Sequence, residues 1–473
     1  MALSAITAFT AIGAVDPPDG QKTWLDTVVV LGGSIAGLLA ARILSDHANR
    51  VLVVEWDDVR GGRGPRRGVP HGAQAHALLA GGARQLERWF PGFITGAVAD
   101  GALIATAQQR LSYLDGMAKV HFPAADMLTT TRPFLEDQIR RRVLSLPNVN
   151  PVAGRAVGLE FSATAVTGVR ILSDSIVNVV KSVDLVVDAM GRSSRLSDWL
   201  TSAGWDRPRM TRRLTGTNYA TATFRRKPGL PPWNGVMALY SGRVGGDLAG
   251  ATFSAVEDDR WIVMMSGYGD CRPGFTPNDM VGRCRRDFPR EFGEVVDGGM
   301  TGSVAVYRQA DSRRRDFAAA GRFPARLLAI GDSVASFNPI YGQGISSAAL
   351  HASCLSLFLH SDPDLYSPAR QFFALQQVIV DAAWEMSTSA DLSRPSVVMP
   401  WRMGYRLANW LSGVVGDASI TDPEVSRRFG DAAHMLRHPR ELVEPRLIAR
   451  ALLARCHSWP EPSPSFDDIS WWP

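Results

Sequence analysis

Two short apolar runs, separated by an amphipathic segment, lie near the start of the chain. Residues 27–31 (TVVVL) and 51–55 (VLVVE) are rich in β-branched residues, which is typical of buried strands. Between them, from Ile35 to His47, small and apolar residues recur at helical spacing. This pattern predicts a βαβ unit at the beginning of the fold.

The middle of the chain carries alternating apolar and polar positions, which are typical of the strands of a sheet. In LSYLDGMAKVHF, Asp115-Gly116 separates two such runs, and Glu257-Asp258-Asp259 does the same in ATFSAVEDDRWIVMMSGYG. Turn residues between alternating runs indicate β-hairpins. We therefore predict a second sheet that is built from the middle of the chain.

The last third of the chain returns to a strand and then to helices. Residues 323–331 form an apolar strand that ends in Gly-Asp, and a helix is expected from Ile345 after a loop rich in Pro and Gly. From about residue 381 the pattern is helical, with WRMGYRLANWLSGVVG and HMLRHPRELVEPRLIARALLARC as its main pieces. The final stretch, SWPEPSPSFDDISWWP, is rich in Pro and Ser and is expected to run over the surface.

Composition excludes several classes of protein. The 473 residues are 45% hydrophobic and 21% charged, as in globular proteins of two or three domains. The net charge of +5 is spread without a long basic run, so we expect no nucleic-acid partner. The four cysteines lack the spacing of a zinc site or a redox dithiol, so we expect no metal and a cytoplasmic location.

The N-terminal segment is apolar, but we do not interpret it as a signal peptide. SAITAFTAIGAV lacks a preceding basic region and runs into DPPDG. No apolar stretch of the chain reaches the roughly 18 residues that a membrane-spanning helix needs. We therefore predict an N-terminal arm and no integral membrane contact.

The predicted βαβ unit carries a glycine pattern that is typical of dinucleotide-binding turns. In LGGSIAG, the first, middle and third small positions of G-x-G-x-x-G are Gly32, Ser34 and Gly37. They make the turn, let the backbone approach a pyrophosphate, and let the helix pack on the strand. Glu55 follows 23 residues after Gly32 and can accept from ribose hydroxyls. The predicted contacts are Gly32, Gly33, Ser34, Ala36, Gly37 and Glu55.

A second glycine cluster, AIGDSVASFNPIYGQGISSAAL, indicates which dinucleotide is bound. With Gly-Asp followed by NPIYGQGIS, the chain resembles the group A flavoprotein monooxygenases. The resemblance implies that Asp332 binds the ribityl hydroxyls of FAD and that the backbone from Pro339 to Ile345, with Gly342 and Gly344, lies near the flavin pyrimidine edge. The alternative reading of Asp332 is a helix N-cap or a turn aspartate.

A closer resemblance, over roughly residues 27–455, is to actinobacterial FAD-dependent epoxidases of polyether and polyketide biosynthesis. The similar pieces are RRGVPHGAQAHALLAGGARQLERWFPG, TTTRPFLEDQIR, DLVVDAMGRSSRLSDWLTSAG, DDRWIVMMSGYG, the second glycine cluster, DPEVSRRF and LVEPRLIARALL. Arg132 corresponds to a position that contacts FAD in that family. Arg66 and Arg67 either serve the same site or are solvated surface charges.

The resemblance implies an α/β fold, in which a glutathione-reductase-like, Rossmann-type FAD-binding domain holds an inserted β-sheet substrate domain and is followed by a helical C-terminal region. The expected arm is 1–25. The expected FAD-binding domain is discontinuous and comprises 26–75, 130–205 and 305–380. The expected substrate domain comprises 76–129 and 206–304, and the helical region with its tail is 381–473.

Two segments depart from the pattern of these relatives. Where many group A hydroxylases have Asp-Gly, this chain has Asp188-Ala189-Met190-Gly191, so the electron source is either NADPH or a separate reductase. In the loop that relatives read as GVPQ-G/A-RHAH, residues 71–76 read HGAQAH, which lacks an Arg and a His. His76 remains as a titratable match, and we interpret it as a buried structural histidine.

The implied chemistry needs few catalytic side chains, because a flavin C4a-hydroperoxide formed from reduced FAD and O₂ supplies the oxygen. We assign no catalytic residue. The site must exclude water and hold a hydrophobic small molecule over the flavin. Alternate residues of the strand around Trp261 and Met264 are expected to line that pocket.

Three functions are compatible with this fold. The first is an FAD-dependent monooxygenase that epoxidises or hydroxylates a polyketide or terpenoid natural-product intermediate. The second is a non-redox [4+2] cyclase of the decalin-forming, spirotetronate type, in which FAD is structural. The third is a flavin-dependent reductase or dehydrogenase.

Overall fold

The predicted βαβ unit is present in the computed structural model, which describes residues 4–20, 22–58, 62–64, 66–227, 233–392 and 405–458. Its elements are β1 (Leu25–Leu31), α2 (Ile35–Ser45) and β2 (Ala48–Glu55). The two strands pair in parallel, with Val29 opposite Leu52. Apolar positions at strand and helix periods therefore define this unit as expected.

The unit forms the centre of a five-stranded parallel sheet with the order β17-β11-β1-β2-β7. The added strands are β7 (Val149–Ala153), β11 (Leu185–Asp188) and β17 (Leu327–Ala329). Helices α5 (Arg132–Leu144) and α9 (Gln343–His360) each pack beside α2. A three-stranded antiparallel sheet, β10-β9-β8, contributes to the same core; its strands are β8 (Arg155–Phe161), β9 (Val166–Ser173) and β10 (Ile176–Lys181).

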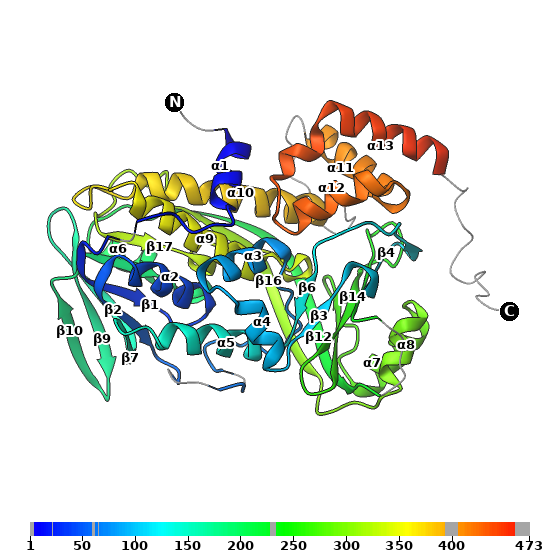
Figure 1. The fold of residues 1–473 in the computed structure, drawn as a ribbon, viewed down its shortest axis with the longest axis horizontal. Helices are drawn as coiled ribbons and strands as arrows, with labels where there is room; N and C mark the ends of the chain where they lie inside the picture. The colour runs from blue at the N-terminus through cyan, green and yellow to red at the C-terminus, as the bar shows by residue number, and fades with distance from the viewer. Residues whose placement is uncertain are drawn as a thin grey trace.

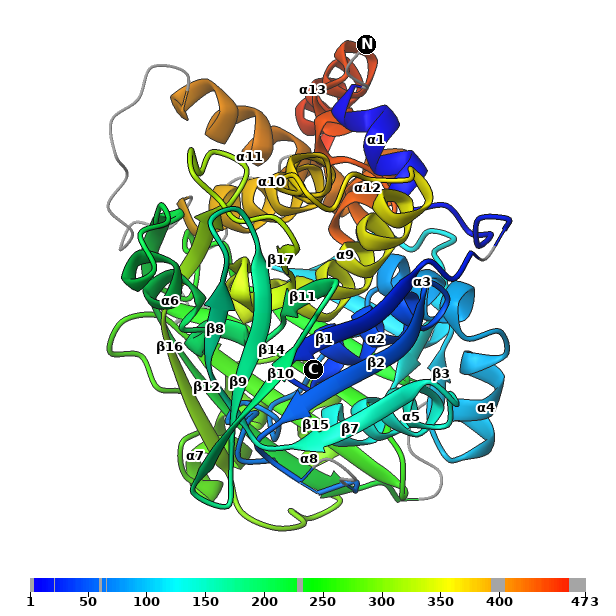
Figure 2. The same cartoon turned by 90° about the vertical axis from the view of Figure 1, so that its left-hand side faces the viewer.

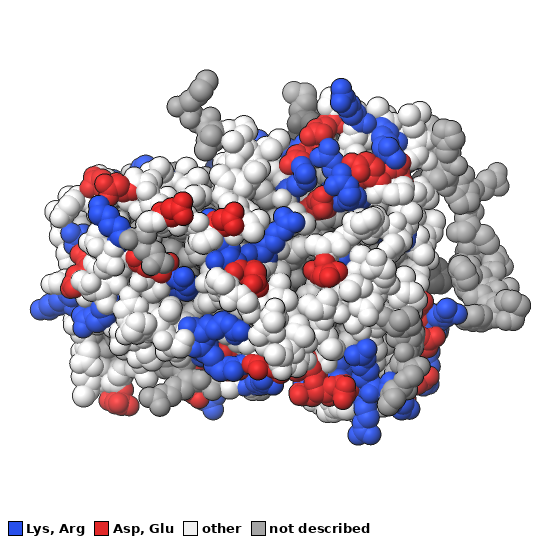
Figure 3. Space-filling model, in the orientation of Figure 1, with Lys and Arg blue, Asp and Glu red and all other residues white. Residues whose placement is uncertain are grey.

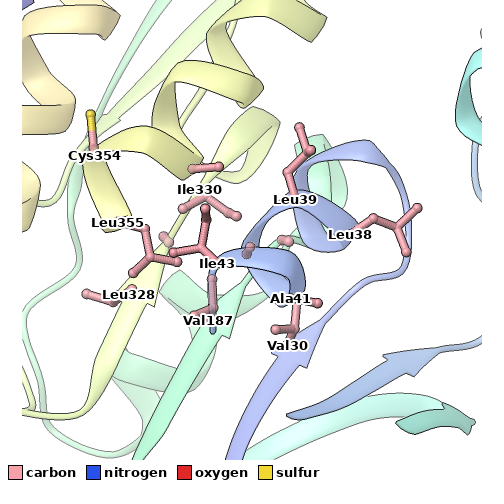
Figure 4. Close-up of a cluster of buried hydrophobic side chains, with 14 of the residues drawn as sticks. Val30, Leu38, Leu39, Ala41, Ile43, Val187, Leu328, Ile330, Cys354 and Leu355 are labelled. Carbon is pink, nitrogen blue, oxygen red and sulfur yellow. The ribbon is translucent and has the colours of Figure 1, made fainter. Parts of the chain in front are cut away.

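Apolar side chains join α2 and α9 to the parallel sheet. Figure 4 shows Val30 and Val187 from β1 and β11 beneath Ile43 of α2 and Leu355 of α9. All four of these side chains are at most 1% exposed. This packing holds both helices against the parallel sheet.

An eight-stranded sheet forms the second layer, with the order β18-β16-β12-β15-β14-β13-β4-β5. Both predicted hairpins lie in it. Asp115 and Gly116 turn between β4 and β5, and Asp258 and Asp259 turn between β14 and β15, all four with positive φ. Its strands are β4 (Arg110–Leu114), β5 (Met117–Ala118), β12 (Arg209–Arg225), β13 (Gly235–Leu239), β14 (Leu248–Val256), β15 (Arg260–Gly267), β16 (Ala305–Asp316) and β18 (Ala335–Ser336).

Helices α7 (Pro277–Arg286) and α8 (Arg290–Val296) cover one face of this sheet and share a separate apolar core with it (Figure 1). Helix α6 (Leu196–Ser202) follows β11. The shorter elements are β3 (Leu103–Ala105), β6 (Met127–Thr129), η1 (Ala107–Gln109), η2 (Gly191–Ser193), η3 (Gly331–Ser333), η4 (Pro339–Tyr341) and η5 (Pro439–Val443).

The packing differs from the expected domain division in three places. Helices α3 (Ala80–Trp89) and α4 (Phe93–Ala99) were expected in the substrate domain, but they share the core of the parallel sheet. Strand β16 was expected in the FAD-binding domain, but it pairs with β12 in the eight-stranded sheet. Helix α10 (Arg370–Leu392) runs unbroken across the expected boundary at 380/381. Apolar periodicity marks the elements correctly but does not specify which core buries them.

The C-terminal helices form a group above β4 and β14 in Figure 1, and Figure 2 shows the same group at the top beside α1. They are α11 (Tyr405–Thr421), α12 (Pro423–Ala433) and α13 (Pro445–Ser458), with a small core of their own. The predicted arm includes helix α1 (Ala5–Ile12), which packs against α9 and α10. The predicted Pro- and Ser-rich surface tail, from 459 onward, lies outside the described residues.

Two surface properties follow from the arrangement. Positive and negative side chains are interspersed on the face seen in Figure 3. Within the described residues, every helix is too short or too polar to cross a membrane.

Candidate functional site

The residues predicted to bind a dinucleotide gather at one edge of the parallel sheet. Gly32 follows the end of β1, Glu55 ends β2, and Asp332 lies three residues beyond β17. Asp188, which was not predicted as a contact, ends β11 at the same edge. Because all these strands are parallel, their carboxyl ends meet at the same edge. This is the edge at which open α/β sheets bind ligands.

The glycine turn after β1 has no room for side chains. Gly32 has a φ of +109°, and a Cβ on it would lie 2.5 Å from the carbonyl oxygen of Ala189. A Cβ on Gly37 would lie 1.8 Å from the carbonyl oxygen of Gly32. The backbone therefore comes as close to helix α2 as the predicted motif requires.

Ser34 stands at the N-cap of α2, but its side chain does not cap the helix. Its hydroxyl instead donates to Glu136 at 3.0 Å and accepts from Arg132 at 3.1 Å. The first N–H groups of a helix that lacks a side-chain cap are available to an anionic ligand. Ala36, the other small residue of the turn, lies against Gly331. A Cβ on Gly331 would lie 2.6 Å from the Cβ of Ala36.

A buried ionic cluster extends from this turn along α5. Glu136 lies one helical turn from both Arg132 and Arg140 and pairs with them at 3.2 and 2.6 Å. Arg140 also donates to the carbonyl oxygen of Gly33 at 2.9 Å. Burial alone would raise the pKa of Glu136, but the positive charges of Arg132, Arg66 and Arg140 outweigh it and lower the pKa to about 2.

Arg66 completes the cluster, so its alternative reading as a solvated surface charge is wrong. It pairs with Glu55 at 2.9 Å and, at a shorter distance, with Glu136, and its side chain is only 9% exposed. Arg67 is exposed. Glu55 in turn accepts from the backbone N–H of Gly33 at 2.8 Å, so a carboxylate stands at the end of β2 where a ribose is expected.

The residues present fit the pyrophosphate of a dinucleotide. Arg66, Arg132 and Arg140 line one cleft together with Gly62, Gly64, Val69, Gly72, Pro133 and Glu136. Arg66 also pairs with Asp57 at 3.6 Å, so the three guanidinium groups are balanced by three carboxylates, Glu55, Asp57 and Glu136, beside the N-terminus of α2. Guanidinium groups bind phosphate oxygens through paired hydrogen bonds.

Asp332 is a half-buried carboxylate with no hydrogen bond to any residue that the structure describes. Ile330, not Asp332, occupies the N-cap position of η3, so the alternative reading as a helix cap is wrong. Burial raises the pKa of Asp332, and the charges of Arg192 and Arg132 offset only part of the effect. A half-buried carboxylate that accepts no hydrogen bond from the described residues is suited to accept from the hydroxyl groups of a ligand.

The second glycine cluster places a turn and a helix start beside Asp332. Pro339 begins η4, and Gly342, with a φ of +66°, stands at the N-cap of α9. Gly344 is exposed and has open space around its Cβ position, whereas Ile345 is buried. The N-terminal end of α9 therefore presents backbone N–H groups without a capping side chain.

The departing segments have structural roles. Asp188 is fully buried and accepts from the N–H of Met190 at 2.9 Å and from the hydroxyl of Ser194 at 2.5 Å. Burial raises its pKa to about 6. His76 contacts the carbonyl oxygen of Gln74 at 2.8 Å, and burial lowers its pKa well below the usual value. Its interpretation as a structural histidine stays a prediction.

The pocket assignment of Trp261 is wrong. Residues alternate between the two faces of β15, so Trp261 and Met264 point to opposite sides of the sheet. Trp261 is 1% exposed and packs edge-on against Phe253 in the core under α7 and α8. Met264 lies opposite Thr221, whose hydroxyl reaches Gln74 on the side of the parallel sheet. Its place in a substrate pocket stays a prediction.

The sequence did not indicate that Glu257 belongs to the site. From the turn between β14 and β15, its buried carboxylate accepts from the hydroxyl of Thr130 at 2.8 Å and from both the N–H and the hydroxyl of Thr131. Thr131 caps α5, and Arg132 is the first residue of that helix. Glu257 therefore ties the eight-stranded sheet to the helix that carries the ionic cluster.

We expect Glu257→Ala to lower the free energy of unfolding by about 1–3 kcal/mol, because it leaves buried donors unpaired. Urea unfolding of the purified protein measures this loss. Asp258→Asn, at the next position, is the matched control. The Asp258 side chain is 64% exposed, and asparagine tolerates the positive φ of this residue. Equal stabilities of the two variants would contradict the prediction.

Comparisons with known proteins agree with the fold described above. No family model matches the chain. Among solved structures, the flavin-dependent brominase Bmp2 aligns with a TM-score of 0.64 and 14% identity, over 91% of this chain and 98% of Bmp2. The p-nitrophenol 4-monooxygenase PnpA from Pseudomonas putida aligns with a TM-score of 0.61 and 17% identity, over 88% and 99%. These likenesses confirm the predicted α/β fold of flavin-dependent enzymes.

PqsL from Pseudomonas aeruginosa, solved in complex with 2-aminobenzoylacetate, has the same fold, with a TM-score of 0.58 and 20% identity over 78% of this chain and 97% of PqsL. The sequence itself is similar to Protein Rv3254 of Mycobacterium tuberculosis, with 30% identity over 454 residues. That alignment covers 92% of this chain and 94% of the relative. Because the likeness extends over nearly the whole of both chains, this protein belongs to the family of Protein Rv3254.

Proposed function

We propose that the protein is an FAD-dependent monooxygenase that epoxidises or hydroxylates a hydrophobic natural product, a polyketide or terpenoid intermediate, with O₂ as co-substrate. One observation carries the proposal: the glycine turn, Glu55 and the unpartnered carboxylate of Asp332 lie at the same edge of a parallel sheet. Electrons come from NADPH or from a separate reductase. The fold shared with the flavin-dependent brominase and with p-nitrophenol 4-monooxygenase supports flavin chemistry of this kind.

Each part of the site has a distinct task in this proposal. Glu55 would accept from the adenosine ribose, and Arg66 and Arg132 would hold the pyrophosphate. Asp332 accepts from the ribityl hydroxyls. The uncapped N-terminus of α9 faces the pyrimidine edge of the ring and favours negative charge there.

Bound FAD, once reduced by the electron source, would supply the two electrons that activate O₂, so that one oxygen atom passes to the substrate and the other leaves as water. The protein holds the substrate against the ring and keeps water out. We assign these tasks to the face of the eight-stranded sheet that carries Met264, because this face turns toward the parallel sheet through Thr221 and Tyr219. No side chain of this face needs to act as a general acid or base.

Asp332→Asn tests the cofactor assignment. The variant loses the anionic acceptor for ligand hydroxyls, so we expect an FAD dissociation constant about 10–100-fold larger. The apo-protein should melt at a higher temperature, because burial of this charge disfavours the folded state at neutral pH. Flavin fluorescence titration and thermal melting of the same samples measure both effects. Lower apo stability with unchanged FAD affinity would overturn the assignment.

The reaction class is tested with the purified holoenzyme. We expect a yellow protein that releases FAD, and not FMN, on acid precipitation. Supplied with NAD(P)H or a reductase, O₂ and a hydrophobic alkene or aromatic polyketide, it should give a product that is one oxygen atom heavier. An isomeric product would instead indicate the cyclase, and a change of two hydrogens would indicate the reductase.

A further inference from the structure

A buried polar cluster lies beside the turn that precedes α9 and is not explained by the proposed chemistry. It joins Tyr219 of β12, Tyr268 after β15, Asn338 before η4, Tyr341 within η4, and Asp391 near the end of α10. Tyr219, Tyr268 and Asn338 are each 1% exposed, and Asp391 is 4% exposed. Four segments that are distant in sequence therefore meet around one carboxylate.

Asp391 is the acceptor at the centre of the cluster. Its Oδ1 accepts from Asn338 Nδ2 at 2.7 Å, from the hydroxyl of Tyr268 at 2.8 Å and from the hydroxyl of Tyr341 at 3.1 Å. A carboxylate can only accept, so it draws the amide nitrogen of Asn338 toward itself. Asn338 Oδ1 is then left to accept from the hydroxyl of Tyr219 at 2.7 Å and from the N–H of Ile340 at 3.2 Å.

The orientation of Asn338 has a consequence for the helix that follows. Its contact with the N–H of Ile340 caps η4, and η4 leads through Gly342 into the first turn of α9. Neither Gly342 nor Gly344 has a side chain that could anchor this stretch. Contacts made by Asn338 and Tyr341 therefore fix where the N-terminus of α9 points.

We propose that Asp391 is a positioning residue, which orients the Asn338–Gly342 turn and with it the uncapped N-terminus of α9 toward the flavin. This inference rests on the proposed function. It adds that the C-terminal end of helix α10, outside the βαβ unit, sets the geometry at the reacting end of the site. The eight-stranded sheet takes part in the same cluster through Tyr219 of β12 and through Tyr268, which directly follows β15.

The test uses hydrogen exchange of the full-length apo-protein together with FAD titration. Asp391→Ala removes the acceptor that Asn338, Tyr268 and Tyr341 share, so amides of residues 338–345 should exchange at least tenfold faster and the FAD dissociation constant should rise at least tenfold. Asp391→Asn keeps an acceptor oxygen, so both quantities should return to within about threefold of the wild type. The visible absorption spectrum of bound FAD should likewise change in Asp391→Ala and stay close to that of the wild type in Asp391→Asn.

Asp381→Ala is the matched control on the same helix. Asp381 accepts from Arg314 and Gln377, each at 2.7 Å, and its side chain is 35% exposed. We expect this variant to leave exchange at 338–345 and FAD affinity within threefold of the wild type. An equal effect of both alanine variants, or exchange that rises as much in β1 and β12 as in the turn, would overturn the proposal.

If Asp391→Ala does not fold, the same hydrogen-exchange measurement is made on Asn338→Asp. The new carboxylate can still cap η4, but it cannot donate to Asp391 and repels it, so exchange at 338–345 should again rise at least tenfold. Wild-type exchange in this variant would overturn the positioning role. If the wild-type protein binds no FAD, the proposed function fails, whereas the exchange data still decide whether Asp391 orders the turn.

Discussion

Gly37→Val should abolish FAD binding and lower the free energy of unfolding by more than about 3 kcal/mol. Even the first carbon of the new side chain would stand 1.8 Å from the carbonyl oxygen of Gly32 and 2.9 Å from its carbonyl carbon. These are backbone atoms, so no side-chain rotation relieves the clash. Helix α2 must move away from β1, and the N–H groups that would meet the pyrophosphate move with it.

The measurement combines urea unfolding with the amount of FAD that remains bound after gel filtration. Gly282→Val is the matched control, because Gly282 lies on α7, far from the parallel sheet, and its Cβ position is open. That variant should retain FAD and change the free energy of unfolding by less than about 1 kcal/mol, because valine is a slightly better helix former than glycine. Normal FAD binding by Gly37→Val would show that the dinucleotide site lies elsewhere.

The parts of the fold that were predictable from sequence are those that local patterns determine. The βαβ unit and both hairpins follow from apolar periodicity and from turn residues such as Asp115-Gly116. Strand alternation also separates Trp261 from Met264, but it does not say which face is covered by α7 and α8. Only tertiary packing decides that question, and it places Trp261 in the core.

The candidate site was predictable where a motif recurs and unpredictable where its residues come from distant segments. The spacing of Arg132, Glu136 and Arg140 places them on one helical face, so this part of the ionic cluster could have been recognised. Arg66 reaches Glu136 across 70 positions, and Tyr268 reaches Asp391 across 123. Such contacts depend on how the sheets and helices meet, which a single sequence does not encode in any local pattern.

Glu136→Gln should lower the free energy of unfolding by about 3 kcal/mol at pH 7, because it removes the one carboxylate shared by Arg66, Arg132 and Arg140. The positive charges of three buried guanidinium groups would then be compensated by fewer negative charges. The neutral amide can still accept a hydrogen bond, so the loss reports mainly on charge. Urea unfolding of the apo-protein at pH 7 measures it.

The pH dependence gives this prediction a definite sign. The pKa of Glu136 is lowered from 4.5 to about 2 in the folded protein, so its contribution is complete above about pH 4.5 and is lost as the pH falls through about 2. The stability difference between wild type and Glu136→Gln should therefore shrink when both are unfolded at pH 3. Glu160→Gln serves as the control, because the Glu160 side chain is 48% exposed and its pair with Arg170 is long, at 3.7 Å. A difference that is equally large at pH 3 and pH 7 would mean that Glu136 contributes by packing, and the ionic cluster would then not be what holds α5 against the glycine turn.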